Sequence, residues 1–208
     1  MACAFLGGLD DPIARLAEEH GPVDFTLPSY DRAPTDPLGR LTLSIVGQLI
    51  SVRAALAVFG RLELLLGGGI EAARLTETEE SALRAIGLSY AKARALRELA
   101  IELTTGRFSF DELVALDDEQ AEARLVALRG VGPWSAQMFL LRAMARPDVF
   151  PAGDLGLRRG IELIDARPSM PSIEQAAGRA LSWRPYRSYA AKYLWLHYGT
   201  DRPLSLQD

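Results

Sequence analysis

One acidic residue and one glycine turn are the groups in this chain whose types and spacing suggest chemistry. From Leu128 to Asp154 the sequence reads LRGVGPWSAQMFLLRAMARPDVFPAGD, which indicates a helix end, a Gly-Val-Gly turn, a second apolar helix and an extended exit. An ionised carboxylate at Asp154 could stabilise a cation that develops on a bound molecule. Aspartate is also a common helix N-cap. The two roles are compatible, because a helix N-terminus favours a negative charge.

The turn Gly130-Val131-Gly132 has the composition of an anion site. Glycine permits positive φ and lets the backbone approach a ligand closely. Pro133 is pre-set for the first position of the following helix, whose free amide groups would point outward at a phosphate. Any hairpin between two helices can use glycine at its turn, so the motif taken alone is weak evidence for phosphate binding.

Helical patterns must position these groups, since no run of alternating β-branched residues predicts a strand. Asp11-Pro12 starts a helix that ends near Glu19. The apolar pattern from Leu38 to Leu66 is too long for one ordinary helix, and Ser51 could cap a second helix after a corner at residues 48–51. The alternative is one continuous, kinked helix. Further helices are expected at residues 78–85, 90–104, 110–114, 118–128 and 133–145, the last of them buried, and after Asp154. The sequence therefore predicts an all-α protein.

Composition excludes several classes of site. The 208 residues include one cysteine, Cys3, and two histidines, which rules out an internal disulfide framework, a four-cysteine metal cluster and a histidine-rich metal centre within the chain. No apolar run approaches the roughly 20 residues that span a bilayer, and the N-terminus does not resemble a signal peptide. A cytoplasmic protein is the default expectation.

The net charge of −4 counts mildly against a nucleic-acid partner. The charges are uneven, however. Residues 179–192 contain four basic and no acidic side chains, whereas residues 111–122 contain six acidic and no basic ones. A local basic face can bind phosphate on an acidic protein.

Five motifs carry a family resemblance that covers about residues 10–198. They are IVGQLISVRAA (45–55), IGLSYAKARALRELA (86–100), LRGVGPWSAQMFLL (128–141), DVFPAGDLGLRRGI (148–161) and WRPYRSYAAKYLW (183–195). Together they resemble the helix–hairpin–helix (HhH-GPD) DNA glycosylase superfamily, and within it the 3-methyladenine DNA glycosylase II (AlkA-like) branch in a compact form without the N-terminal β-domain.

The resemblance implies a fold and an activity. The fold would be all-α and two-lobed, with one lobe from residues 36–115, the other from the N-terminal segment plus residues 116–208, and the active-site cleft between them. The activity would be base excision repair. A monofunctional glycosylase would flip an alkylated purine such as 3-methyladenine or 7-methylguanine out of double-stranded DNA and hydrolyse its N-glycosidic bond. Such an enzyme is expected to act as a monomer, without a membrane and without a required cofactor.

The resemblance also assigns roles to residues. Asp154 matches the catalytic aspartate, which stabilises the oxocarbenium-like state and activates water, and Leu49 matches the wedge that fills the gap left by the flipped nucleotide. The expected base-pocket residues are Trp134, Met138, Trp195 and Gln48, with Gln48 at the pocket mouth. The expected phosphate-binding residues are Gly130, Val131, Gly132 and Ser135. The main-chain carbonyls of Val126, Leu128 and Val131 would hold a structural Na⁺ or K⁺.

The sequence departs from the family pattern at two positions. Trp134 occupies the position where bifunctional relatives carry a Schiff-base lysine, which implies no lyase step. Met138 stands where some members have tyrosine.

Several residues have an alternative, structural role. Both expected pocket tryptophans could be plain core residues. Arg184 and Arg187 could contact phosphate, or they could be a structural pair. A non-catalytic DNA-binding or damage-sensing protein, or a glycosylase for uracil or mismatched bases, are the alternative functions.

Overall fold

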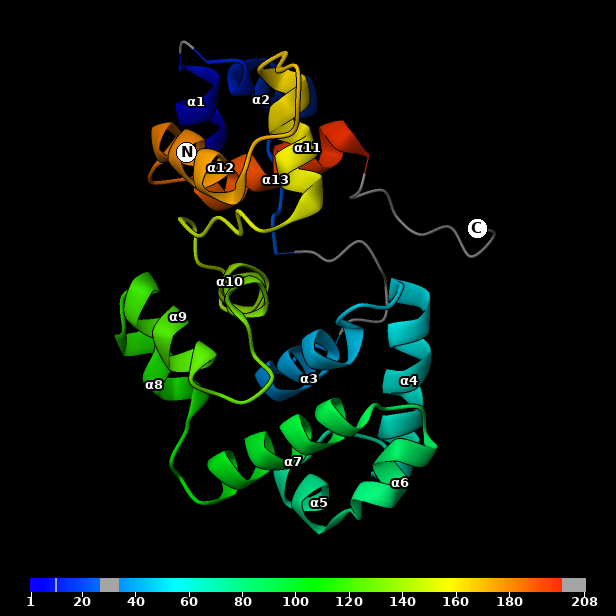
Figure 1. Cartoon of the computed structure of the whole chain (residues 1–208). Coiled ribbons are helices and arrows are strands. Elements are labelled where there is room, and N and C mark those ends of the chain that lie inside the picture. The colour runs from blue at the N-terminus through cyan, green and yellow to red at the C-terminus, as the bar shows by residue number, and fades with distance from the viewer. Residues whose placement is uncertain (10, 27–33, 200–208) are drawn as a thin grey trace. The chain divides into compact units, whose positions relative to one another are not determined.

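The computed structural model describes residues 1–9, 11–26 and 34–199 (Figure 1). Every regular element within these ranges is a helix, so the all-α prediction is confirmed. None of the helices in this described part of the chain combines the length and the apolarity needed to cross a bilayer.

The chain divides into two compact units, which are described separately. One unit comprises residues 32–139, and the other comprises residues 1–31 and 140–208. The sequence-based expectation placed the boundary near residue 115. In the structure, α8, α9 and most of α10 belong instead with the helices that precede them.

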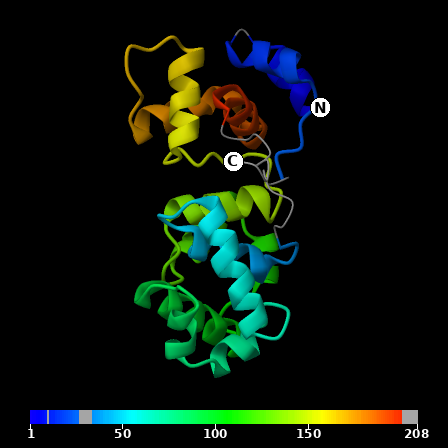
Figure 2. The same ribbon diagram turned by 90° about the vertical axis from the view of Figure 1, so that its right-hand side faces the viewer.

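The unit of residues 32–139 is built around the helix α7. Its helices are α3 (Pro37–Gly47), α4 (Val52–Leu65), α5 (Ala72–Glu77), α6 (Glu80–Ala85), α7 (Tyr90–Thr104), α8 (Phe110–Ala115), α9 (Asp118–Val126) and α10 (Pro133–Arg142), which continues past the boundary. Helix α7 packs against α3, α5 and α6 through its buried face, which includes Ala93, Leu96 and Leu99. Figure 2 brings α4, in cyan, to the front of this unit.

The corner between α3 and α4 lies where the sequence predicts it. The side chain of Asp36 accepts the Gly39 amide at 2.7 Å and starts α3, and the hydroxyl of Ser51 accepts the Ala54 amide at 3.3 Å and starts α4. The cap at Ser51 confirms two helices, and the alternative of one continuous kinked helix is wrong. Residues 48–51 form the connection between them.

Short helices account for most of the differences from the sequence-based prediction. Helix α1 (Ala2–Gly7) and helix α5 were not expected, because six residues are too few to show a helical period. The N-cap of α9 is Asp117 in a capping box with Gln120, one residue before the expected Asp118. Helix α10 ends three residues before the expected position 145, and Ala145 has a φ of 53°.

The unit of residues 1–31 and 140–208 is built around α13 (Arg187–Tyr198). The other helices are α1, α2 (Ile13–His20), α11 (Leu155–Ile164), α12 (Ile173–Ala180) and the 3₁₀ turn η1 (Leu181–Trp183). Helix α13 packs against α11, α2 and α1. Gly160 permits the approach of α11, because a Cβ there would lie 3.0 Å from the Cβ of Leu194.

A charged cluster fastens α2 and α12 within this unit. The guanidinium of Arg179 donates to Asp11 at 2.9 Å and to Asp165 at 3.0 Å, and it lies 4.7 Å from the ring centroid of the buried Trp183. Burial opposes ionisation of Asp11, but hydrogen bonds from Arg179 and from the Ile13 amide outweigh it and hold the pKa of that carboxyl below its usual value. Arg179 is therefore a structural cation.

Replacing Arg179 by methionine should destabilise the protein by roughly 2 kcal/mol at pH 7, because two mostly buried carboxylates lose their shared cation. A group with a depressed folded pKa stabilises the protein above its unfolded pKa, near 4 for aspartate, and loses this contribution as the pH falls through the folded value. The deficit of Arg179→Met should therefore shrink at acidic pH. Thermal unfolding at several pH values measures it, and Arg159→Met, at an exposed pair with Glu162, is the matched control. Equal melting temperatures of wild type and Arg179→Met at pH 7 would show that Arg179 does not stabilise the two carboxylates.

Candidate functional site

The hairpin between α9 and α10 rests directly on α7. Gly130 has a φ of 80°, and a Cβ at this position would lie 2.6 Å from the Cβ of Ala95. Both the backbone conformation and the close approach therefore require glycine. Gly132 does not share this constraint, since its φ is not positive and no atom lies within 4 Å of its would-be Cβ.

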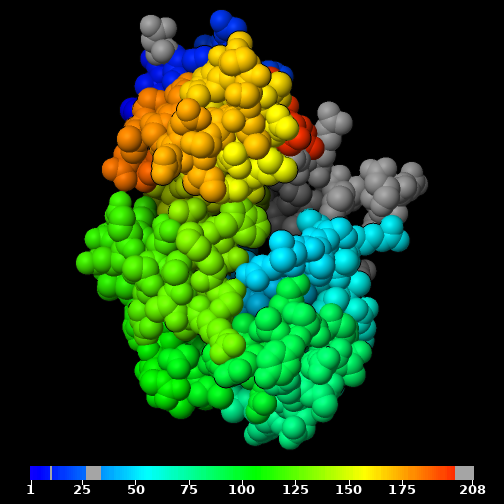
Figure 3. Space-filling model, in the orientation of Figure 1, coloured from blue at the N-terminus to red at the C-terminus, as the bar shows by residue number. Residues whose placement is uncertain are grey.

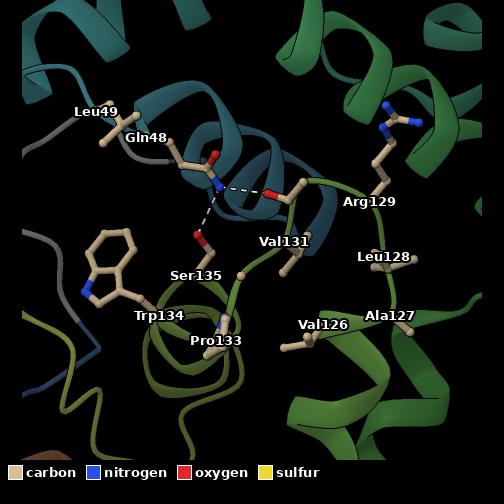
Figure 4. A pocket seen from close by; sticks show the side chains of 12 residues that line it. Gln48, Leu49, Val126, Ala127, Leu128, Arg129, Val131, Pro133, Trp134 and Ser135 are labelled. Carbon is tan, nitrogen blue, oxygen red and sulfur yellow. Dashed lines mark hydrogen bonds between the residues drawn. The ribbon is translucent and has the colours of Figure 1, made fainter. Parts of the chain in front are cut away.

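A pocket of about 650 Å³ opens along this hairpin (Figure 4). Two segments that are distant in sequence line it, namely the α3–α4 corner with Gln48 and Leu49, and the continuous stretch from Val126 to Ser135. Figure 3 shows that the hairpin segment, in yellow-green, and the α3–α4 segment, in blue to cyan, both reach the same face of this unit. The structure thus brings together all of the expected wedge and phosphate-binding residues, which are Leu49, Gly130, Val131, Gly132 and Ser135.

Gln48 joins the two segments. Its side-chain nitrogen donates to the carbonyl oxygen of Gly130 at 2.8 Å and to the hydroxyl of Ser135 at 3.2 Å, as Figure 4 shows. Ser135 is buried in the first turn of α10. Gln48 was expected at the mouth of a base pocket, and in this structure its amide links the corner to the hairpin.

Leu49 follows Gln48 and has a conformation unusual for leucine. Its φ is 60°, in the left-handed region, and its side chain is fully exposed. A left-handed residue costs about 1–2 kcal/mol for a side chain with a Cβ, and the exposed apolar surface gains nothing from burial. Residues held in such conformations concentrate at functional sites. The geometry therefore marks Leu49 as a candidate contact residue.

The aromatic residues expected in the base pocket differ in exposure. Trp134 is 40% exposed and lines the pocket beside the hairpin, whereas Trp195 is only 4% exposed within the other unit. Met138 is half-buried on α10. Trp134 therefore presents part of its surface at the pocket, while most of Trp195 belongs to the core.

Asp154 is the N-cap of α11. Its Oδ1 accepts the Leu157 amide at 3.0 Å and the indole N–H of Trp195 at 3.0 Å. The guanidinium of Arg142 lies 4.8 Å from the ring centroid of Trp195. The two donors fix the orientation of a half-buried carboxylate at a helix N-terminus, where a negative charge is favoured. The sequence predicted the cap, and the indole partner is new.

The basic stretch of residues 179–192 is used largely inside the protein. Arg187 makes a two-pronged ion pair with Asp148, at 2.8 and 3.0 Å, and Arg184 reaches the same carboxylate at 3.3 Å. Arg187 is mostly buried, whereas Arg184 is half-exposed. The structural interpretation therefore holds for Arg187.

Sequence analysis missed Lys92. Its Nζ donates to the carbonyl oxygens of Val46 and Gln48 at 2.8 and 2.7 Å. Burial lowers the pKa of this amine. The only signal in the sequence was the scarcity of lysine in a chain that uses arginine for nearly all of its basic residues.

Side chains offer no metal site in the described residues, where no group of three or more histidine, cysteine, aspartate or glutamate residues is suitably placed. Of the carbonyls expected to hold a monovalent cation, that of Leu128 accepts the Val131 amide at 3.1 Å, which leaves a second lone pair on this oxygen. Val126, Leu128 and Val131 all line the pocket.

A family model and the sequences of individual proteins both relate this chain to DNA repair glycosylases. The model of the HhH-GPD superfamily of base excision DNA repair proteins matches residues 43–185. Schizosaccharomyces pombe DNA-3-methyladenine glycosylase 1 is 28% identical over 193 residues, which cover 91% of this chain and 83% of that protein. A putative DNA-3-methyladenine glycosylase of Bacillus subtilis is 31% identical over 121 residues, and the match spans only 42% of its length.

Solved structures show the same relationship. The Schizosaccharomyces pombe 3-methyladenine DNA glycosylase in complex with abasic DNA aligns with a TM-score of 0.80 and 27% identity, and the alignment covers 93% of this chain and 94% of that one. A DNA-3-methyladenine glycosidase from Bacillus halodurans aligns with a TM-score of 0.81 and 32% identity over 92% of this chain and 86% of the other.

Substituting Gly130 by alanine should destabilise the unit of residues 32–139, because a left-handed φ costs about 1–2 kcal/mol and the clash with Ala95 adds to it. Removing the clash in Gly130→Ala with Ala95→Gly should recover only part of the loss. Gly132→Ala, in open space, is the matched control. Thermal and urea unfolding measure all three variants, and a fully stable Gly130→Ala would show that the hairpin does not rest on α7 as described.

Proposed function

The chain belongs to the HhH-GPD superfamily of base excision DNA repair proteins, and from this we propose that it is a monofunctional DNA glycosylase of the 3-methyladenine type. It would hydrolyse the N-glycosidic bond of alkylated purines such as 3-methyladenine and 7-methylguanine after flipping them out of double-stranded DNA, acting as a monomer. The observation that carries the proposal is a carboxylate oriented by two hydrogen bonds, at Asp154, in a chain aligned almost end to end with a 3-methyladenine glycosylase bound to abasic DNA.

Asp154 would act on the sugar. Cleavage of the bond between C1′ and the base leaves positive charge on the sugar, as in glycoside hydrolysis. The base departs with the bonding electron pair, and water adds to C1′ while Asp154 orients it and takes up its proton. An N3- or N7-alkylated purine is cationic in DNA and becomes neutral on leaving, so no general acid is needed. The fixed bonds from Leu157 and Trp195 keep the carboxylate from reorganising during the step.

Base selection would rest on aromatic faces. A cationic alkylpurine stacks on tryptophan with about 1–2 kcal/mol of cation–π attraction. Trp134, with 40% of its surface exposed, is the stronger candidate for such a platform, and Trp195 would contribute through the indole that orients Asp154. Met138, on the same helix as Trp134, supplies a polarisable apolar surface.

DNA would be held by the hairpin and opened by the corner. The backbone of Gly130, Val131 and Gly132 at the start of α10 suits a phosphate, and the pocket beside it is open to a ligand. Leu49 would fill the gap left by the flipped nucleotide. Its exposed, left-handed conformation supports this role, since the free protein gains nothing from presenting an apolar side chain in that way.

A monovalent cation is part of the proposal. Carbonyl oxygens suit Na⁺ and K⁺. Val126, Leu128 and Val131, whose carbonyls would bind the ion, all line one pocket. Such an ion would add positive charge beside the hairpin where a phosphate binds.

Exchange of Na⁺ and K⁺ for tetramethylammonium at constant ionic strength should weaken binding to DNA, because the larger ion cannot bind to the carbonyl oxygens. Unchanged binding would exclude a role for a monovalent cation.

Replacing Asp154 by asparagine should lower the release of 7-methylguanine from duplex DNA about 100- to 1000-fold. Asparagine is a good N-cap, and its side-chain oxygen can still accept the bonds from Leu157 and Trp195, so the fold and the binding of abasic duplex should persist. Single-turnover release of free base is the measurement. Asp111→Asn, at an exposed N-terminal turn of α8, is the control for the lost charge and should release base normally.

Equal release by wild type and Asp154→Asn would exclude the proposed role of this carboxylate. Binding to damaged duplexes by the wild type without release of any base would instead support a non-catalytic, damage-sensing protein. Release of uracil in preference to alkylpurines would redirect the proposal to that substrate class.

Borohydride trapping should give no covalent protein–DNA adduct. A lyase step needs a free amine that attacks C1′. The position where bifunctional relatives carry that lysine is Trp134, and the amine of Lys92 is engaged by two backbone carbonyls. Trp134→Lys tests the same point in reverse, since it restores an amine there. A trapped adduct with the wild-type protein would contradict monofunctional hydrolysis.

A further inference from the structure

The end of α3 leaves carbonyl oxygens that the corner itself does not satisfy. The last four carbonyls of a helix lack partners within the helix. The amide of Gln48 reaches the carbonyl of Ile45 at 3.5 Å, and the amide of Ile50 reaches that of Gly47 at 3.3 Å. The carbonyls of Val46 and Gln48 receive the ammonium of Lys92 instead.

Lys92 is an unexpected residue at its own position. It lies in the first turn of α7, three residues after the N-cap Ser89, where a positive charge is unfavourable for the helix dipole. The same charge is favourable at the C-terminal end of α3. The half-buried ammonium thus stabilises the C-terminal end of α3 and slightly destabilises the N-terminal end of α7.

The same corner is held from a second side. The main-chain oxygen of Gln48 accepts a hydrogen bond from Lys92, and its side-chain amide nitrogen donates to the Gly130 carbonyl and the Ser135 hydroxyl. We call the Nζ of Lys92 together with both ends of Gln48 the Lys92–Gln48 clamp. Leu49, strained and fully exposed, follows directly after the clamped residue.

Helix α7 is a common base for the corner and the hairpin. Lys92 and Ala95 are three residues apart and therefore lie on neighbouring positions of one face. Lys92 holds the corner at residues 46–48, while Ala95 contacts the hairpin at Gly130. The separation between the hairpin and Leu49 is thereby fixed before any ligand arrives.

We infer that Lys92 is a positioning residue for Leu49, which keeps the corner ordered in its inserting conformation before DNA is bound. The inference rests on the proposed function, since it assigns Leu49 the task of filling the stack. A corner that is already ordered does not lose conformational entropy on insertion. This saving in conformational entropy matters only for duplex DNA, where a base must be unstacked and Leu49 inserted. A lesion in single-stranded DNA needs neither step.

The first test uses the free protein and does not depend on activity. Lys92→Met keeps a straight apolar side chain of similar length but removes the donor, whereas Lys92→Arg keeps donors for both carbonyls. Arg84→Met, which removes an exposed charge on α6 of the same unit, is the matched control. Hydrogen exchange of the amides at residues 47–51 should rise about tenfold in Lys92→Met and stay unchanged in Lys92→Arg and Arg84→Met.

The second test compares two substrates. Single-turnover release of 7-methylguanine from duplex DNA should fall about tenfold in Lys92→Met, while release from the same strand without its complement should stay within about twofold of wild type. Lys92→Arg should recover most of the duplex activity. A purely structural defect would lower both rates together, so the duplex-to-single-strand ratio separates positioning from damage to the fold.

Unchanged exchange at residues 47–51, or an equal loss on both substrates, would overturn the inference. If Lys92→Met does not fold, Lys92→Gln, which removes the charge and shortens the side chain but keeps a polar end, is measured in the same way. If the wild type releases no base from either substrate, the proposed function fails while the exchange result still decides whether the clamp orders the corner. Fluorescence of 2-aminopurine beside an abasic analogue, which reports unstacking without hydrolysis, then decides whether that order serves insertion.

Discussion

The proposed reaction depends on the orientation of one carboxylate, that of Asp154. Asp154 caps α11 and receives the indole N–H of Trp195, so its orientation is fixed by a helix end and by a buried aromatic ring. Groups that already point at a developing charge need no reorganisation when it forms, which is the main source of electrostatic catalysis. Capping a helix and stabilising a cation both require an oxygen with a fixed position and, for the cation, a negative charge. One ionised aspartate can therefore do both.

The remaining candidate residues share a second constraint, which is the surface of α7. The hairpin approaches this helix so closely at Ala95 that only glycine fits, and the α3–α4 corner is tied to the same helix through Lys92. Gln48 then connects the corner with the hairpin. A rigid helix thus fixes the spacing between the backbone that suits a phosphate and the leucine proposed to enter the stack, and no ligand is needed to establish it.

Local signals were readable from the sequence, whereas long-range contacts were not. The caps at Ser51 and Asp154 follow from residue type beside an apolar period, and Gly130 follows from its place between two helices. The resemblance pointed to Leu49, but no residue type in the sequence signals the left-handed φ of 60° that the fold imposes there. The bonds of Lys92 to Val46 and of Gln48 to Gly130 join residues 46 and 82 positions apart, and no periodicity encodes such pairs. The sequence left the role of Arg187 open between a structural ion pair and a phosphate contact for the same reason, since its partner Asp148 lies 39 positions away.

Binding of a charged mimic of the reacting sugar measures whether Asp154 stabilises positive charge at C1′. A duplex that carries a cationic pyrrolidine abasic analogue resembles the charge state that Asp154 is proposed to stabilise, whereas a neutral tetrahydrofuran analogue has the same shape without the charge. Complementarity to the transition state predicts that the wild-type protein binds the cationic duplex about 100-fold more tightly than the neutral one. Equal dissociation constants for the two duplexes would show that the protein does not stabilise that charge.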